Sequence, residues 1–273
     1  MHCTNITPPY LQIVNTSQLF VPNSLFVESL DMCVCLFGLS PNVTEYLTEQ
    51  LNALLQQQKI KQVPPVYLVK HPTLLSDIPM FDLSLFESNV SKHILQIGQQ
   101  LRKMTSIYRL PLSSSYEKLW LTGTKNMRKV TELFNKECAF LGFTSLKVGD
   151  VNRAYVSEEE YDGWLTKNIV LLDMFDAAAN NTVLECIVRC TPLVVIKMPA
   201  TVYYLGEEYP LYFTELEEVP ALLSNTELIR KAHVYLKEKV KATVPSMDAF
   251  VSTLTTLCMR HIYDVVPERP SIL

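Results

Sequence analysis

Two short apolar runs constrain the fold of this chain most strongly. They are "NIVLLDMF" at 168–175 and "PLVVIKM" at 192–198, and neither shows the apolar–polar alternation of a strand with one solvated face. A strand that is apolar on both faces is typical of a parallel sheet covered by helices on both sides. The segment between the two runs is long enough for the helical crossover that parallel strands need. We therefore predict an α/β fold built on a parallel sheet.

The alternation of apolar strands and amphipathic segments extends over most of the chain after residue 90. Ser157, with Glu160 three residues later, is a capping-box pattern at a predicted helix start. Further strands are predicted at 92–98, 117–123 and 144–150. Helices are predicted at 126–143, 157–167, 180–190, 200–206, 225–240 and 246–262. This order of elements indicates a Rossmann-like parallel-sheet domain over 91–273, closed by C-terminal helices.

The residues before this domain carry a shorter pattern of the same kind. Predicted strands at 32–40 and 65–72 flank a predicted amphipathic helix at 41–58, and 73–90 is expected to be a connection. A complete second α/β domain normally needs more residues than these. We therefore expect residues 1–90 to form a partial or abbreviated second α/β domain and a linker.

The composition argues against several classes of partner. Lys and Arg number 24 against 28 Asp and Glu, so the basic excess that nucleic-acid binding usually requires is missing. No apolar run approaches the ~18–20 residues that span a bilayer, and the opening "MHCTNITPPY" lacks the apolar core of a signal peptide. Seven irregularly spaced cysteines favour a reduced compartment. The expectation is a cytoplasmic protein with no nucleic-acid partner and no transmembrane segment.

The motif inventory removes other classes. No G-x-G-x-x-G, P-loop, C-x-x-C, H-E-x-x-H or G-x-S-x-G occurs, which disfavours dinucleotide dehydrogenases, P-loop ATPases, zinc hydrolases and nucleophile-elbow esterases. Asp173 and Asp176 form D-x-x-D rather than the D-x-D of metal-dependent sugar transferases. Neither a metal nor a cofactor is therefore predicted.

The first candidate site is the segment "DAAANNTVLE" at 176–185, which lies between a predicted buried strand and a predicted helix. Its three alanines leave room for a ligand, and the free N–H groups of a helix start favour a phosphate. Asn180 and Asn181 can cap that helix, and Thr182 lies in its first turn. Glu185 lies one turn after Asn181 and suits the hydroxyls of a ribose. The alternative is an ordinary capped helix with a solvated glutamate.

The second candidate site follows the strand that ends at Gly98, in the segment "LQIGQQLRKMTSIYRL" at 95–110. Arg102, Lys103 and Arg109 follow the glycine within a loop or a helix start. Arginine recognises phosphate through two parallel hydrogen bonds, and lysine adds a point charge beside it. A solvated basic helix face is the alternative.

Two further residues are candidates on their position alone. Lys125 in "GTKNM" follows a predicted strand and could contact a base or a phosphate, with a simple turn as the alternative. His71 in "KHP" ends a predicted strand near the expected cleft between the two domains.

Taken together, these segments resemble the C-terminal, donor-binding half of a GT-B type glycosyltransferase. The resemblance rests on "ILQIGQQLRKMTSIYRL", "KLWLTGTKNM", "KNIVLLDMFDAAANNTVLECIVRCTPLVV" and "MPATVYYLGEEYPLYF". It covers about 92–215 and extends more weakly back to about residue 30. In many retaining enzymes of this type, a strand that ends in glycine leads to an arginine and a lysine that bind the pyrophosphate. Arg102 and Lys103 are the matching residues, and their adjacency departs from the family spacing.

The resemblance also implies roles for two acidic positions eight residues apart, the first on the donor sugar and the second on the ribose. Glu185 matches the second position. Eight residues earlier stands Ala177, and Asp176 is one residue off, so the sugar contact departs from the family pattern. Cys190 stands where the family usually has a glycine.

The function that the resemblance implies is the transfer of a sugar from a nucleotide-diphosphate donor to a hydroxyl of a glycan, lipid or protein. Arg102 and Lys103 would stabilise the leaving diphosphate, and Asp176 or Asn180 would orient the sugar. A second reading is a nucleotide-sugar-binding module without catalysis, which acts with a partner chain that supplies an acceptor domain. A third is another Rossmann-like nucleotide-sugar enzyme, such as an epimerase, on fold-level likeness only.

Overall fold

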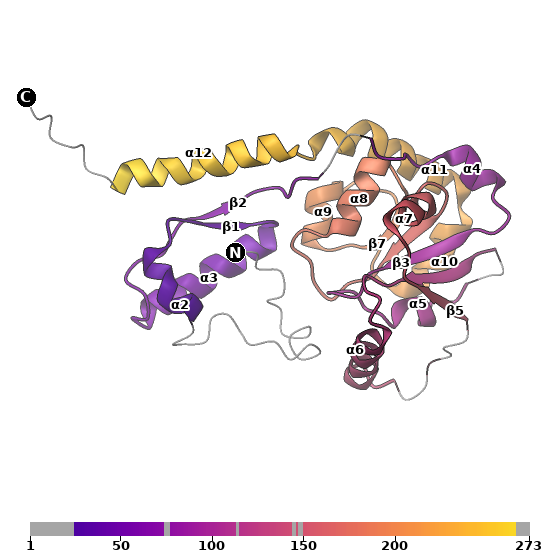
Figure 1. Ribbon diagram of the computed structural model, residues 1–273, viewed down its shortest axis with the longest axis horizontal. Coiled ribbons are helices and arrows are strands. Elements are labelled where there is room, and N and C mark those ends of the chain that lie inside the picture. Colours follow the sequence, from indigo (N-terminus) through magenta and orange to yellow (C-terminus); the bar gives the residue numbers. More distant parts are fainter. Residues whose placement is uncertain (1–24, 74–76, 113–114, 144–145, 147–149, 266–273) are drawn as a thin grey trace, which may run out of the picture.

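The computed structural model describes residues 25–265, apart from 74–76, 113–114, 144–145 and 147–149. These residues form a large unit around a six-stranded sheet and a small unit around a two-stranded one, as Figure 1 shows. In the part of the chain that is described, no helix combines the length and the apolar character that crossing a bilayer requires.

The large unit contains the predicted parallel sheet. Its strands are β3 (His93–Ile97), β4 (Glu117–Leu121), β5 (Val151–Ala154), β6 (Ile169–Leu172), β7 (Leu193–Ile196) and β8 (Tyr212–Phe213). Every pairing is parallel, and the order across the sheet is β5-β4-β3-β6-β7-β8. The chain therefore builds outward from β3 in one direction and then from β6 in the other, which is the doubly wound order of a Rossmann-like fold.

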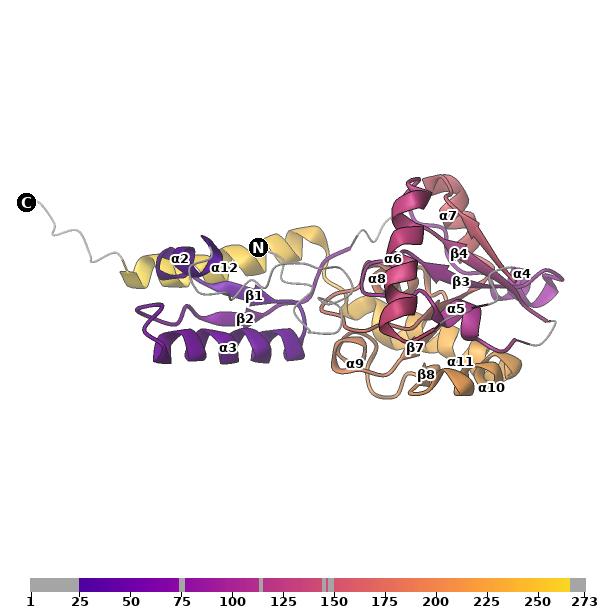
Figure 2. The ribbon, with the colours of Figure 1, turned by 90° about the horizontal axis from the view of Figure 1, so that it is seen from below.

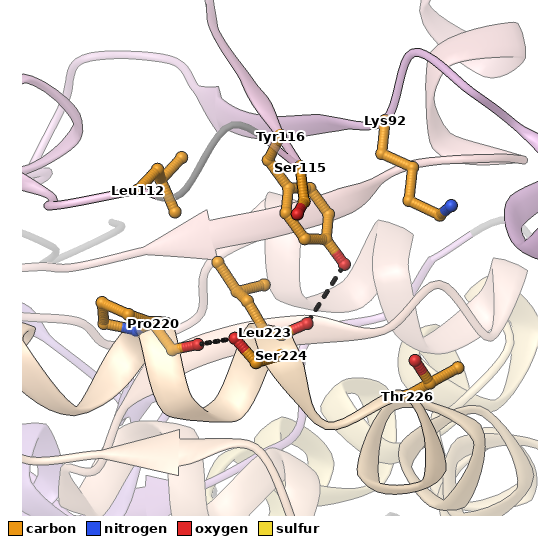
Figure 3. Close-up of a pocket in the computed structure, with 8 residues that line it drawn as sticks. All are labelled: Lys92, Leu112, Ser115, Tyr116, Pro220, Leu223, Ser224 and Thr226. Atoms are coloured by element: carbon orange, nitrogen blue, oxygen red, sulfur yellow. Dashed lines mark hydrogen bonds between the residues drawn. The ribbon is translucent and has the colours of Figure 1, made fainter.

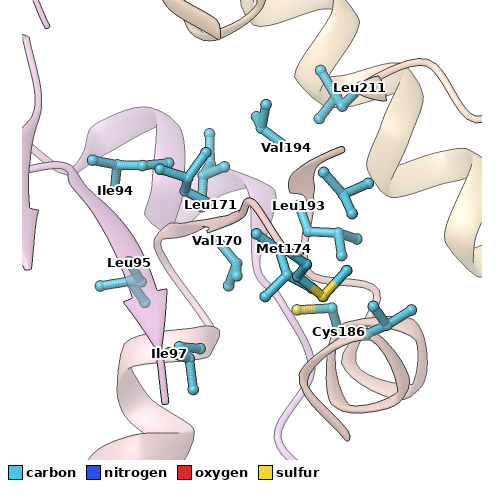
Figure 4. Packing of buried hydrophobic residues seen from close by; sticks show 14 of the residues in the cluster. Ile94, Leu95, Ile97, Val170, Leu171, Met174, Cys186, Leu193, Val194 and Leu211 are labelled. Carbon is cyan, nitrogen blue, oxygen red and sulfur yellow. The ribbon is translucent and has the colours of Figure 1, made fainter. Parts of the chain in front are cut away.

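The two apolar runs singled out in the sequence are β6 and β7, at the centre of this sheet. All four residues of β6 are buried, because helices cover the sheet on both sides; α6 (Met127–Phe140) and α8 (Asn181–Arg189) lie on opposite sides of it in Figure 1. Figure 4 shows the resulting core, in which side chains from neighbouring strands pack directly on one another. The side chains with no exposed surface include Ile94, Leu95, Val170, Leu171, Leu193 and Val194.

The helices of the large unit include those predicted from the sequence and three others. They are α4 (Leu83–Ser88), α5 (Ser106–Arg109), α6, α7 (Glu158–Leu165), α8, α9 (Pro199–Leu205), α10 (Val219–Ser224) and α11 (Thr226–Tyr235). The Ser157–Glu160 capping box at the start of α7 is confirmed. The three others are α4, which lies inside the predicted connection, α5 and α10. The predicted strand at 144–150 lies mostly outside the described residues, and strand β5 follows it in the sequence.

The small unit consists of α2 (Leu25–Ser29), a 3-10 turn at Leu30–Met32, β1 (Leu36–Gly38), α3 (Pro41–Gln56) and β2 (Val66–Leu68). The predicted helix at 41–58 is confirmed, and β1 and β2 lie within the two predicted strands. They pair in parallel over three residues each.

The C-terminal helix α12 (Met247–Val265) returns to the small unit and lies along it in Figures 1 and 2. Phe250, Leu254 and Leu257 of α12 pack against the apolar cluster that contains Leu39 and Val43. The predicted domain boundary after residue 90 stays a prediction. Helix α12, which the prediction assigned to the second domain, contacts the small unit because its apolar side chains are buried there.

Candidate functional site

The site predicted from the sequence lies where the sheet reverses its building direction. Strands β3 and β6 are neighbours, yet the chain leaves β3 toward β4 and leaves β6 toward β7 on the other side. Open α/β sheets bind their ligands at the carboxyl ends of such a strand pair. The segments that follow β3 and β6 carry the candidates at 98–103 and at 176–185, so the fold brings the two predicted sites together.

Backbone contacts hold these two segments against each other. The Lys103 N–H donates to the Asp173 carbonyl oxygen at 2.9 Å, and the Phe175 N–H donates to the Leu101 carbonyl oxygen at 3.0 Å. Gly98 and Leu101 both have positive φ angles, of 74° and 63°. Glycine adopts this left-handed conformation freely, whereas leucine does so at a cost. The turn after β3 is therefore sharp and is anchored to the segment after β6.

Arg102 is the centre of the site. Its Nε donates to the Ile97 carbonyl oxygen at 3.0 Å, and its Nη1 donates to the Gln100 carbonyl oxygen at 2.6 Å. Its Nη2 donates to Asn180 Oδ1 at 3.2 Å and to Thr182 Oγ1 at 2.8 Å. The guanidinium thus connects the end of β3 to the first turn of α8, where the helix dipole adds a partial positive charge.

Lys103 differs from Arg102 in that a carboxylate neutralises it. Its Nζ lies 3.0 Å from Asp173 Oδ1, and the Asp173 side chain is only 5% exposed. Ser106 Oγ donates to the other carboxylate oxygen at 2.6 Å. No local pattern in the sequence indicates this pair, because Lys103 and Asp173 follow different strands. The predicted contact of Lys103 with a diphosphate stays a prediction.

The segment after β6 forms the predicted capped helix start. Asn180 Oδ1 accepts the Val183 N–H at 3.3 Å, which confirms Asn180 as the N-cap of α8. Asn181 is exposed, and Thr182 is buried. Asp176 is only 7% exposed, and its Oδ1 accepts the Ala177 N–H at 2.8 Å. Its predicted role toward a donor sugar is untested, and its carboxylate is partly engaged in this turn.

Glu185 lies one turn further along α8 and is held by a tyrosine. The Tyr161 hydroxyl on α7 donates to Glu185 Oε2. Burial raises the pKa of Glu185, while the Tyr161 hydrogen bond and the charges of Arg189 and Arg102 oppose that rise. Burial therefore favours the neutral carboxyl of Glu185, and its polar neighbours favour the charged one. Glu185 is half-buried, unlike the solvated glutamate expected on an ordinary capped helix.

Two hollows flank the Arg102 guanidinium. The first, which we call the tyrosine hollow, has a volume of about 250 Å³ and is mostly apolar; its lining includes Gly98, Tyr155, Tyr161, Thr182 and Glu185. The second, which we call the histidine hollow, has a volume of about 270 Å³; its lining is His71, Gln100, Leu101, Arg102, Ala179, Asn180 and Asn181. Arg102 Nη2 bonds one residue of each lining, so the guanidinium lies between the hollows.

The remaining predicted residues line neither hollow. Lys125 is exposed, and its Nζ lies 5.1 Å from the ring centroid of Tyr155, which lines the tyrosine hollow. Arg109 lies at the end of α5, 4.8 Å from the ring centroid of Phe143. Cys190 ends α8 with a φ of 56°, the left-handed region that favours glycine, at the position where the resemblance expects glycine.

The sequence reasoning missed Glu137. This carboxylate on α6 has no exposed surface and accepts hydrogen bonds from the Met104 N–H, the Thr105 N–H and the Thr105 hydroxyl, each at 2.8 Å. It therefore anchors the chain directly after Arg102 and Lys103. The available signal was its position, three residues after Phe134 and seven after Val130, on the apolar stripe of a predicted helix. A charged residue on such a stripe is buried only if it has partners.

A third hollow lies at the opposite edge of the sheet, near the start of β3 and β4 (Figure 3). It has a volume of about 290 Å³. The Tyr116 hydroxyl donates to the Leu223 carbonyl oxygen at 3.3 Å, and Lys92 Nζ donates to the Asn89 carbonyl oxygen at 2.9 Å. Its lining contains no buried charged residue; it consists of Lys92, Leu112, Ser115, Tyr116, Pro220, Leu223, Ser224 and Thr226.

Within the described residues, no group of three His, Cys, Asp or Glu side chains is placed to hold a metal ion. The expectation of a metal-independent site stays a prediction.

Comparison with known proteins gives a fold and no sequence relative. No protein-family model and no curated protein matches the sequence. Among solved structures, sucrose-phosphate synthase from Thermosynechococcus elongatus matches over 88% of this chain and 61% of its own length, with a TM-score of 0.57 and 13% identity. A trehalose 6-phosphate synthase from Burkholderia multivorans matches over 88% of this chain and 62% of its own, with a TM-score of 0.58 and 8% identity.

A third match is TarM from S. aureus, in a complex that contains UDP, over 85% of this chain and 45% of that one, with a TM-score of 0.56 and 11% identity. The large unit and the small unit together thus have the fold of GT-B glycosyltransferases, as the sequence resemblance predicted. The chain spans less than two thirds of the length of these three structures.

Proposed function

We propose that this chain binds a nucleoside-diphosphate sugar and transfers the sugar to a hydroxyl acceptor. The observation that carries the proposal is the Arg102 guanidinium, which lies between the end of β3 and the first turn of α8 with a hollow on either side. A guanidinium beside a helix N-terminus is suited to a diphosphate. The site also lies at the switch point of a doubly wound sheet.

The two hollows differ in a way that matches the two ends of such a donor. The tyrosine hollow is largely apolar and contains the Glu185 carboxylate, so it suits a base and a ribose whose hydroxyls donate to the carboxylate. The histidine hollow is lined by an imidazole, a guanidinium and amides, so it suits a sugar ring. The diphosphate would then lie at Arg102. Two solved structures of similar fold support a donor of this class: the TarM complex contains UDP, and an E. coli neighbour is described as bound with UDP-2-fluoro glucose.

In the proposed transfer, the bond between the anomeric carbon and the diphosphate oxygen breaks, and its electron pair leaves with the diphosphate. The acceptor hydroxyl oxygen forms the new bond to the anomeric carbon, and its proton passes to the leaving phosphate or to a base. Arg102 and the N–H groups at the start of α8 stabilise the negative charge that develops on the leaving group. The stereochemical outcome is left open.

A second candidate function is nucleotide-sugar binding without turnover, in company with a partner chain. Three observations support it. Lys103 is neutralised by Asp173, and the Asp176 carboxylate is engaged by the Ala177 N–H rather than directed wholly at a ligand. The small unit also contributes only a two-stranded sheet within the described residues.

The test is calorimetry with three ligand pairs: UDP and UDP-glucose, GDP and GDP-mannose, and ADP and ADP-glucose. We expect one pair to bind, and Arg102→Met to weaken that nucleoside diphosphate about 100-fold, because two charge-assisted hydrogen bonds are lost. Arg102→Lys, which keeps the charge, should lose less. Lys92→Met, at the opposite edge of the sheet, is the matched control and should bind normally.

The absence of binding to any pair by the folded wild-type protein would refute the proposal. A second assay separates the two candidate functions. Release of free sugar or of a glycosylated acceptor from the bound donor indicates a transferase, whereas tight binding without release over a range of hydroxyl acceptors indicates a binding module.

A further inference from the structure

We propose that Cys35 and Cys258 form a reversible disulfide that fastens the C-terminal helix α12 to the small unit. Cys35 directly precedes β1, and Cys258 lies on α12, so the two residues are 223 positions apart in the sequence. Their Sγ atoms lie 3.9 Å apart. Neither cysteine lines the proposed donor site, so this inference is independent of the proposed function.

The two thiols need only a small movement to form a bond. A disulfide places its sulfur atoms about 2.0 Å apart, so the two Sγ atoms must approach each other by roughly 2 Å. Each sulfur lies at the end of one rotatable side-chain bond, so changes of rotamer can bring the sulfurs together. Both cysteines are partly exposed, and a small oxidant in solution can therefore reach them.

Cys33 is a third thiol in the same place and is the competing partner. Its Sγ donates to the Cys35 carbonyl oxygen at 3.2 Å. This contact holds the Cys33 sulfur against the backbone of its own segment, whereas the Cys35 sulfur contacts the sulfur of Cys258 on α12. The structure therefore favours Cys35 as the partner of Cys258.

The disulfide would strengthen an apolar contact between α12 and the small unit. Leu254 of α12 packs against the cluster that contains Leu39 of the small unit and Ala178 of the large unit. Cys258 lies one helical turn after Leu254, on the same face of α12. In Figures 1 and 2, α12 lies along the small unit in both views. A covalent bond at Cys258 would keep α12 from separating from the segment before β1, and the apolar cluster would stay closed.

The oxidant that balances the reaction is a small-molecule disulfide such as oxidised glutathione. The thiolate of one cysteine attacks a sulfur of the oxidant, whose S–S bond breaks and releases one thiol. The thiolate of the other cysteine then attacks the mixed disulfide, forms the bond between Cys35 and Cys258, and releases the second thiol. The two cysteines lose two electrons and two protons, and the oxidant gains both. Burial raises the pKa of Cys35 to about 11, so the reaction should accelerate as pH rises.

The experiment treats the full chain with oxidised glutathione at mildly alkaline pH. Free thiols are then alkylated, the protein is digested without reduction, and mass spectrometry identifies the cross-linked peptides. Cys35→Ser and Cys258→Ser each remove one partner, whereas Cys33→Ser keeps the pair. Cys138→Ser is the matched control, because Cys138 is also partly exposed but lies on α6 of the large unit. Thermal unfolding under reducing conditions verifies the fold of each variant.

We expect a cross-link between Cys35 and Cys258 in the wild type, in Cys33→Ser and in Cys138→Ser, and no such link in the other two variants. Oxidation should raise the Tm of the wild type by about 5 °C, because the bond closes a long loop in the unfolded chain, and dithiothreitol should reverse the rise. Amide hydrogen exchange in α12 should slow in the oxidised protein.

Three results would refute the proposed pair: no intramolecular link, a link from Cys33 to Cys258, or a mixed disulfide with glutathione that persists on Cys35 or Cys258. A link between Cys35 and Cys258 that changes neither the Tm nor the hydrogen exchange of α12 would refute the fastening of the helix.

Discussion

The two edges of the six-stranded sheet carry hollows of nearly equal size and different chemistry. The tyrosine and histidine hollows at the carboxyl ends of the strands measure about 250 and 270 Å³, and the hollow at the other edge about 290 Å³. The carboxyl edge contains the Arg102 guanidinium and, beneath it, the buried carboxylates Asp173 and Glu137. The other edge has no buried charge in its lining. The two edges therefore differ in buried charge and not in the size of their hollows.

The difference follows from the direction of the backbone. In a doubly wound sheet each helix runs back antiparallel to the strands, so helix starts gather at the carboxyl edge and helix ends at the other. Helix starts present unbonded N–H groups, which need anions or oxygen acceptors. Helix ends present carbonyl oxygens, and at the amino edge these accept hydrogen bonds from local donors: Tyr116 donates to Leu223 at the end of α10, and Lys92 donates to Asn89 at the end of α4.

The strongest test of this comparison removes the buried carboxylate that supports the carboxyl edge. Glu137→Gln keeps the size of the side chain but directs an NH₂ group at buried donors. We expect it to lower the free energy of unfolding by about 3 kcal/mol, because up to two of three buried hydrogen bonds are lost. It should also weaken nucleoside-diphosphate binding, since the chain after Arg102 loosens. Urea unfolding and calorimetry measure the two effects, and full stability would contradict the anchoring role.

A smaller effect is expected at Glu185. If its carboxylate accepts hydrogen bonds from the ribose, Glu185→Gln should weaken binding about 10-fold and abolish the preference for ribose over deoxyribose nucleotides. Leu184→Ile, a substitution on the buried face of the same helix, is the control for general perturbation of α8. A variant that still prefers ribose would remove Glu185 from the site.

The same residue gives a pH dependence with a definite sign. Burial raises the pKa of Glu185, and only the ionised form accepts from two hydroxyls, so affinity should fall as pH decreases through that raised pKa. Its contribution to folding has the opposite sign: it is present below the unfolded pKa and is lost as pH rises through the folded one. Calorimetry as a function of pH should lose this dependence in Glu185→Gln.

The smallest effect is expected at the amino edge. Burial raises the pKa of Tyr116 to about 12. The stability it contributes is complete below about pH 10 and is lost as pH rises toward about 12, because the unfolded chain ionises first. Tyr116→Phe should cost at most about 1 kcal/mol near neutral pH and should flatten the alkaline loss of stability. Nucleotide affinity should not change; a change would show that the two edges are not independent.

Much of the site was predictable because its signals are local. The small residues before α8, the Asn180 cap and the glycine that ends β3 each depend on neighbours within a few positions, and the structure shows the cap and the sharp turn. Which loops meet was also inferable, since parallel strands share one carboxyl edge. The partner of Lys103, however, is set by packing between segments that follow different strands, and no local pattern encodes it.

The amino-acid sequence by itself determined the α/β class, the parallel sheet and the position of most helices, because apolar periodicity follows directly from the geometry of each element. It also pointed to the GT-B fold. Only the tertiary structure decided that Glu137 of α6 supports the segment after Arg102, that Asp173 neutralises Lys103, and that His71 reaches the site through Tyr204. The residues in contact lie 32 positions apart for Glu137 and Thr105, and 133 positions apart for His71 and Tyr204. Lys103 and Asp173 lie 173 − 103 = 70 positions apart. These contacts arise because burying a polar group requires a partner, and the fold, not the local sequence, determines which partner is within reach.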